Sequence, residues 1–90
     1  MNKAELTKSI ATGAEVSYEL ARKMLDAFQQ TIENALVHGD KVSIRGLGAF
    51  VVSDHSARYY HHPLTGEAKM ARAFRSVRFV ASKQLRDLLN

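Results

Sequence analysis

Apolar residues in the first 40 positions recur at the spacing of an amphipathic α-helix. Leu6, Ile10 and Ala14 form a short series that loses its pattern near Gly13. A longer series, with an apolar residue at every fourth position, consists of Leu20, Met24, Phe28, Ile32 and Leu36. Each series places its apolar side chains on one side of a helix, so the chain is expected to begin with two helices.

Capping residues indicate where these helices begin and end. Asn2 followed by Glu5 fits a capping box, in which two side chains satisfy free amides of the first turn. Ser17 is a natural N-cap for the second helix. Gly39 suits the left-handed position that follows the end of a helix. The second helix is therefore expected to run from just after Ser17 to about His38.

Beyond residue 40 the apolar period changes from four residues to two. Apolar and polar residues alternate over 41–45, Gly46-Leu47-Gly48 supplies a turn, and a second strand begins at Ala49. The segment from about 53 to 77 is expected to form two strands around the turn Pro63-Leu64-Thr65-Gly66. Ser82 can cap a last short helix over 83–89. Helices followed by strands predict an α+β fold in a single domain.

The ribbon expected over 53–77 has too few large apolar residues to pack on a core. An isolated two-stranded ribbon is marginal in water, so such a segment is retained when a partner subunit or a ligand orders it. The apolar stripe of the second helix, in which Met24 and Phe28 are expected to be core residues, also has no long sheet to cover it. We therefore expect a dimer, whose second chain is either an identical copy or a paralogue.

Charge is divided unevenly between the two halves of the chain, whose formal net charge is +4. Residues 1–40 carry four Lys or Arg against six Asp or Glu, and residues 41–90 carry nine against three. A basic second half indicates a polyanionic partner. The chain has no cysteine, which excludes disulfides, thiolate zinc sites and a cysteine nucleophile. No apolar run has the length of a signal peptide core or a membrane span, so we expect a cytoplasmic location.

Five segments resemble the bacterial histone-like family of HU and integration host factor proteins. They are Met1-Asn2-Lys3-Ala4-Glu5-Leu6, Gly39-Asp40-Lys41-Val42, Ile44-Arg45-Gly46-Leu47-Gly48-Ala49-Phe50, Pro63-Leu64-Thr65-Gly66-Glu67, and Phe79 with Lys83-Gln84-Leu85-Arg86-Asp87. Their spacing is similar to that of the family over all 90 residues. The resemblance implies an intertwined dimer with a helical base, a three-stranded antiparallel sheet and a long β-ribbon arm. In those terms residues 1–39 are the helical dimerisation part, 40–80 the sheet and arm, and 81–90 the C-terminal helix.

The family is itself a standard example of proteins that bend DNA through the minor groove, so this mechanism comes with the resemblance. Pro63 would be a wedge at the arm tip, and Arg72 and Arg78 would face DNA if the strand is regular, because Val77 and Phe79 occupy the other face. The full set of expected DNA contacts is Lys3, Arg45, Arg58, His61, His62, Pro63, Arg72, Arg78, Lys83 and Arg86.

Some residues depart from the family pattern. The tip has His61-His62-Pro63 where the family usually has Arg-Asn-Pro, which reduces the charge of the arm. Leu47 occupies a position that is usually aromatic, and Val80 replaces a common lysine. Ala81-Ser82 replaces the Pro-Gly that usually precedes the last helix.

The histidines and tyrosines of the arm have alternative interpretations. His55, His61 and His62 could form a metal or nuclease cluster, but neighbouring strand residues face opposite sides and no carboxylate pair flanks them. We favour exposed imidazoles that touch phosphate or sugar. Tyr59 and Tyr60 either stack on nucleobases or pack across the ribbon, and we favour packing.

We therefore expect a non-enzymatic, architectural protein that binds the minor groove of double-stranded DNA with little sequence specificity and bends it. Such a protein would contribute to nucleoid organisation. We expect no cofactor, no metal, no membrane association and no small-molecule substrate. The alternative is a dimeric interaction module that uses the β-arm to bind another protein, and a hydrolase that uses the histidines is a more remote one.

Overall fold

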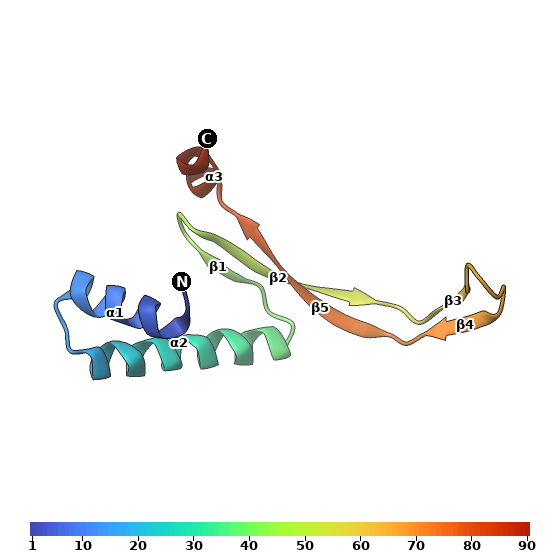
Figure 1. Ribbon diagram of the computed structural model, residues 1–90, viewed down its shortest axis with the longest axis horizontal. Helices are drawn as coiled ribbons and strands as arrows, with labels where there is room; N and C mark the ends of the chain where they lie inside the picture. Colours follow the sequence, from blue (N-terminus) through green and yellow to red (C-terminus); the bar gives the residue numbers. More distant parts are fainter. The chain divides into compact units, whose positions relative to one another are not determined.

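The computed structural model describes residues 1–90, which form three helices and five strands (Figure 1). The helices are α1 (Lys3–Ala14), α2 (Tyr18–Val37) and α3 (Lys83–Leu89). The strands are β1 (Val42–Ile44), β2 (Gly48–His55), β3 (Arg58–His61), β4 (Ala68–Ala71) and β5 (Phe74–Ala81). The expected α+β class is confirmed. Two compact units can be described separately, residues 1–35 and residues 36–90.

The first unit is a pair of capped helices. The Asn2 side chain accepts a hydrogen bond of 2.9 Å from the Glu5 amide, and Ser17 Oγ accepts one of 3.1 Å from the Leu20 amide. Both N-caps therefore lie where the sequence predicted them. The end of α1 is less conventional, because Glu15 adopts a left-handed conformation with φ of 58° although it is not glycine.

The second unit contains a three-stranded antiparallel sheet with the strand order β1-β2-β5. The Phe50 and Phe79 rings lie opposite each other in the β2–β5 register, with centroids 5.2 Å apart. Ser82 caps α3 by accepting a hydrogen bond of 3.1 Å from the Leu85 amide, and its own hydroxyl donates to the Gly46 carbonyl at 2.9 Å. These two bonds tie the start of α3 to the β1–β2 turn.

The arm is a separate two-stranded sheet made of β3 and β4, and it lies beyond the end of the β2–β5 pair (Figure 1). The predicted turn at its tip is confirmed: the His62 amide donates to the Glu67 carbonyl and the Gly66 amide donates to the His62 carbonyl, both at 2.8 Å. Gly66 has φ of 71°, a conformation that glycine adopts without strain. The ribbon is not continuous, because residues 56–57 and 72–73 belong to no strand.

Very few side chains are buried within this single chain. Only the side chains of Ala11, Ala21 and Thr7 are buried. Met24 and Phe28 are 52% and 48% exposed, so this chain alone does not form the core expected around them. The helix periodicity predicts an apolar stripe, but it does not indicate whether the same chain or another one covers it.

Gly48 provides a test of the packing in the sheet. A Cβ atom at this position would lie 2.4 Å from the Val80 carbonyl oxygen and 2.6 Å from the Phe79 ring. We expect Gly48→Ala to lower the free energy of unfolding by about 1–3 kcal/mol, because backbone cannot move aside as a flexible side chain does. Urea unfolding at one protein concentration measures the change. Gly13→Ala is the control: no atom lies within 4 Å of its Cβ, and alanine should leave stability unchanged or raise it.

Candidate nucleic-acid interface

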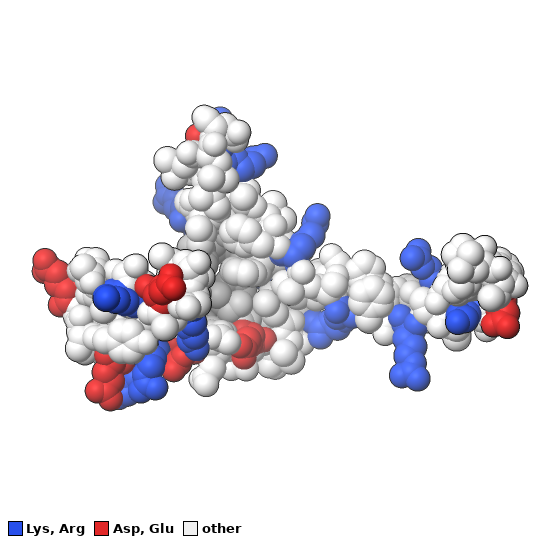
Figure 2. Space-filling view, viewed as in Figure 1, with Lys and Arg blue, Asp and Glu red and all other residues white.

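The arm carries exposed positive charge along its length. Arg58 lies on β3, Lys69 on β4, and Arg72 just after β4, and all three are exposed. Figure 2 shows lysine and arginine side chains projecting from this ribbon. Lys69 was not among the expected contacts, although its position in the arm was visible in the sequence. The arm therefore provides cations for phosphate contacts at several points.

The tip of the arm brings His61, His62 and Pro63 together, as expected. His62 Nδ1 accepts a hydrogen bond of 3.2 Å from the Leu64 amide, and His61 Nδ1 lies 3.3 Å from the Gly66 carbonyl oxygen. Pro63 is exposed, and the Leu64 side chain is 90% exposed. Both histidines thus support the turn that presents two apolar side chains to solvent. Leu64 was not among the expected contacts, because exposure within a turn leaves no periodic signal in the sequence.

The sheet also places Arg78 as expected. Arg78 pairs with Val51, whereas its neighbour Phe79 contacts Phe50. Successive strand residues point to opposite faces, so Arg78 lies on the face opposite the phenylalanine pair. Arg72 was expected on this face only if the strand is regular, and that condition is not met. That residue lies between β4 and β5, where the strand is interrupted, and regular alternation does not extend to it.

Arg75 is a basic residue of β5 that makes contacts within the protein. Its guanidinium donates to the Leu36 and Val37 carbonyls at 2.9 Å each, and its Nε lies 3.6 Å from the Asp54 carboxylate. The last carbonyls of a helix have no partner within the helix and carry partial negative charge. Arg75 therefore satisfies the C-terminus of α2 from the sheet.

Three further expected contacts lie near the start of α3. Arg45 is in the β1–β2 turn, and the hydrogen bond between Ser82 and Gly46 places this turn next to Lys83. Arg86 follows one turn later on α3. All three cations are exposed. The structure thus gathers the turn and the helix start into one positively charged region of the second unit.

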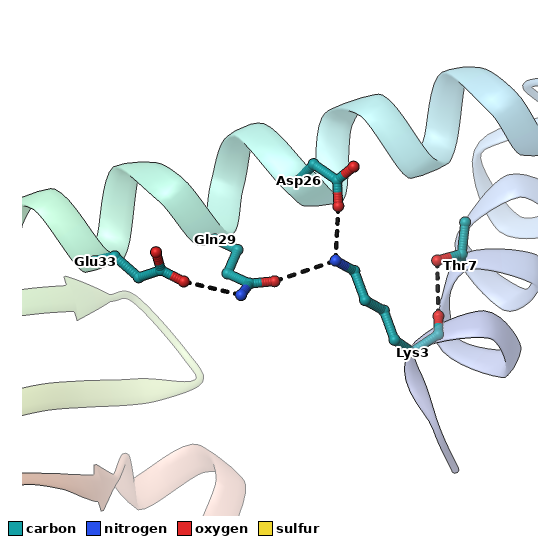
Figure 3. Close-up of polar contacts among 5 residues, drawn as sticks. All are labelled: Lys3, Thr7, Asp26, Gln29 and Glu33. Atoms are coloured by element: carbon teal, nitrogen blue, oxygen red, sulfur yellow. Dashed lines mark hydrogen bonds and ion pairs between the residues drawn. The ribbon is translucent and has the colours of Figure 1, made fainter.

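Lys3 is engaged within the first unit. Its Nζ lies 2.7 Å from the Asp26 carboxylate and donates to Gln29 Oε1 at 3.3 Å (Figure 3). Gln29 in turn donates to Glu33 at 2.8 Å. The hydrogen bond from Lys3 holds the pKa of the Asp26 carboxyl below its ordinary value. A phosphate that binds Lys3 must therefore compete with Asp26.

The histidines do not gather into a metal site. His55 lies at the end of β2, where its Nε2 is 2.9 Å from Ser76 Oγ, whereas His61 and His62 belong to the tip. The chain has no group of three or more His, Asp or Glu side chains placed to hold a metal ion. No helix has the length and apolar character needed to cross a bilayer.

Comparisons with known proteins agree with this geometry. The family model described as "Bacterial DNA-binding protein" matches residues 1–90. DNA-binding protein HU-1 of Halalkalibacterium halodurans is 40% identical over 90 residues, all of both chains. DNA-binding protein HU-beta of Escherichia coli is 37% identical, also over all of both chains.

Solved structures give the same result. An Anabaena HU–DNA cocrystal structure matches with a TM-score of 0.86 and 36% identity, covering 99% of this chain and 97% of that one. HU from Thermotoga maritima matches with a TM-score of 0.70 and 26% identity over all of both chains. The chain belongs to the bacterial DNA-binding protein family of HU-type, non-enzymatic architectural proteins.

Proposed function

We propose that this protein binds the minor groove of double-stranded DNA with little sequence specificity, bends the duplex, and contributes to nucleoid organisation in the cytoplasm. The observation that carries the proposal is the β3–β4 arm, a ribbon with exposed cations along its sides and exposed Pro63 and Leu64 at its tip. A similar chain, Anabaena HU, has been crystallised with DNA. Cations supply affinity for phosphates, and an apolar tip can enter a base step.

The proposed contacts have two roles. Pro63 acts as the wedge, His61 and His62 contact phosphate or sugar beside it, and Arg58 contacts phosphate where the arm begins. The remaining cations hold the flanks of a bent duplex by their phosphates, and these are Lys3, Arg45, Arg72, Arg78, Lys83 and Arg86. Phosphate contacts carry no sequence information, so preference among DNA sites comes from how easily a site deforms.

A homodimer is the assembly that we propose. Large apolar side chains remain in solvent on all three helices and on β3, β4 and β5, including Phe28 at 48%, Phe79 at 45% and Leu88 at 84% exposure. A monomer rarely leaves so much apolar surface uncovered, and a second copy of the chain offers the matching surface. In this assembly residues 1–39 form the helical dimerisation part, 40–80 the sheet and arm, and 81–90 the C-terminal helix.

Sedimentation equilibrium tests the assembly. The purified protein at micromolar concentration should have twice the 10.0 kDa mass of the chain. Phe28→Glu places a charge in the proposed interface and should give monomer or unfolded chain. Tyr59→Glu also replaces an aromatic side chain by glutamate, but at a position in the arm that is 74% exposed, and it should leave the dimer intact. A well-folded wild-type monomer would show that the apolar stripe has another partner, such as a paralogue.

Bending can be separated from binding by two substitutions in the arm. Pro63→Ala removes a rigid apolar ring but no charge, so the bend angle should fall while affinity for straight duplex changes little. Arg58→Ala should weaken binding to all duplexes and make the slope of log K against log salt shallower by about one per lost phosphate contact. Fluorescence transfer between the ends of a short duplex at saturating protein measures the bend. If the end-to-end distance is the same for Pro63→Ala and wild type, the tip is a turn and not a wedge.

The competition between Asp26 and phosphate for Lys3 predicts a gain of affinity. Asp26→Asn removes the carboxylate that lies 2.7 Å from Lys3 Nζ, so DNA binding should tighten and its salt slope should steepen. Titrations at two salt concentrations measure both quantities. Glu33→Gln removes the same charge from α2 without touching Lys3, so it serves as the control. An equal gain for both variants would attribute the effect to net charge and exclude Lys3 as a specific contact.

A further inference from the structure

An aromatic pair stands at the root of the arm. His55 and Phe74 are cross-strand partners at the last position of the β2–β5 register, and their rings stack with centroids 4.4 Å apart at an angle of 10°. The Phe74 side chain is nevertheless 56% exposed. The His55 imidazole therefore covers one face of the Phe74 ring, and much of the rest of the ring is in solvent.

The pair lies on the face of the sheet that carries Arg78. Phe74, Ser76 and Arg78 alternate along β5 and so share one face. The other face carries Phe79, which contacts Phe50, and Arg75, which reaches the end of α2. Phe74 thus points away from the packed side of the sheet, in the direction that we propose for DNA.

The geometry of the pair is fixed by its neighbours. His55 Nε2 lies 2.9 Å from Ser76 Oγ, two residues along the same face, which sets the plane of the imidazole. One residue away in each strand, Asp54 and Arg75 form an ion pair across the sheet. Stacking on an ordered imidazole also restricts the rotamers of Phe74. Little side-chain entropy is therefore lost when a ligand binds.

A hollow adjoins the pair where the arm begins. It has a volume of about 350 Å³ and is lined by Asp54, His55, Ser56, Arg58, Ala71 and Phe74. Arg58 is the first residue of β3, so a cation and an aromatic face border the same space. This combination of a π-face and a guanidinium is the chemistry that proteins use to hold single-stranded nucleotides.

We propose that Phe74, backed by His55 and flanked by Arg58, binds an unpaired nucleobase of a DNA duplex. Bases in an intact duplex present only their edges to a groove, and an aromatic ring gains most by stacking on a face. A base left without a partner by a bulge or a mismatch exposes that face, and Arg58 would hold its phosphate. Because every base has a π-face, the site tolerates any base. The inference rests on the proposed function and assigns Phe74 to it as a base-stacking residue.

The test compares two duplexes of the same sequence, one fully paired and one with a single 2-aminopurine in a one-nucleotide bulge. Binding of the full-length wild-type protein to the bulged duplex should quench 2-aminopurine fluorescence, because the base stacks on Phe74. Phe74→Leu keeps the apolar bulk but removes the π-face. It should lose the quenching and bind the bulged duplex about fivefold to a hundredfold more weakly than wild type, the range expected for one base–aromatic stack, while binding paired duplex normally.

Tyr59→Leu is the matched control, since it also replaces an exposed aromatic of the arm by leucine. It should keep the wild-type affinity for the bulged duplex and the quenching. The site is excluded if Phe74→Leu behaves as wild type, if Tyr59→Leu loses as much affinity for the bulged duplex as Phe74→Leu, or if Phe74→Leu weakens binding to both duplexes equally. In all three cases binding to paired duplex by the wild type would still support the proposed function. A wild-type protein that binds neither duplex overturns the proposed function and this inference together.

Discussion

The shortage of burial within one chain is the constraint on which the rest of the structure depends. Three small side chains, Thr7, Ala11 and Ala21, are the only ones that the chain buries by itself. Hydrophobic burial is the main favourable term in folding, and a 90-residue chain has little of it to spare. Here the apolar groups are spread over the surfaces of two helices, a small sheet and a short terminal helix. In the proposed homodimer folding and association would be one process, as they are in obligate dimers.

Polar contacts at the ends of elements provide the local order that burial does not. Asn2, Ser17 and Ser82 satisfy the amides at three helix starts, and Arg75 satisfies two carbonyls at the end of α2. Such contacts fix where each element begins and ends without needing a large core. The cations left exposed elsewhere are then available to a polyanion, because the structure does not use them internally. Lys3 is the exception, since it has an internal partner.

The sequence predicted those parts of the fold that depend on local periodicity. The helix caps, the turn at Pro63-Leu64-Thr65-Gly66 and the helix over 83–89 all depend on residues within a few positions of each other, and all were placed correctly. The interruption of the ribbon at 56–57 and 72–73 was not predicted, because neither segment contains a glycine or a proline that would mark a break in a strand. Arg72 was assigned to a strand face for this reason. The contacts of Arg75 and the His55–Phe74 pair were missed because the partners lie 19 or more residues apart in the sequence and only the tertiary fold brings them together.

The interruption between the sheet and the arm has a mechanical consequence. In a continuous ribbon, any displacement of the tip would strain the hydrogen bonds of the β2–β5 ladder. Here the ladder ends at His55 and Phe74 and resumes at Arg58 and Ala71, so the two segments are joined only through residues 56–57 and 72–73. Bending is expected to concentrate in this link, because no strand pairing spans it. In the proposed complex the arm would then follow grooves of different width and curvature while the sheet keeps its shape.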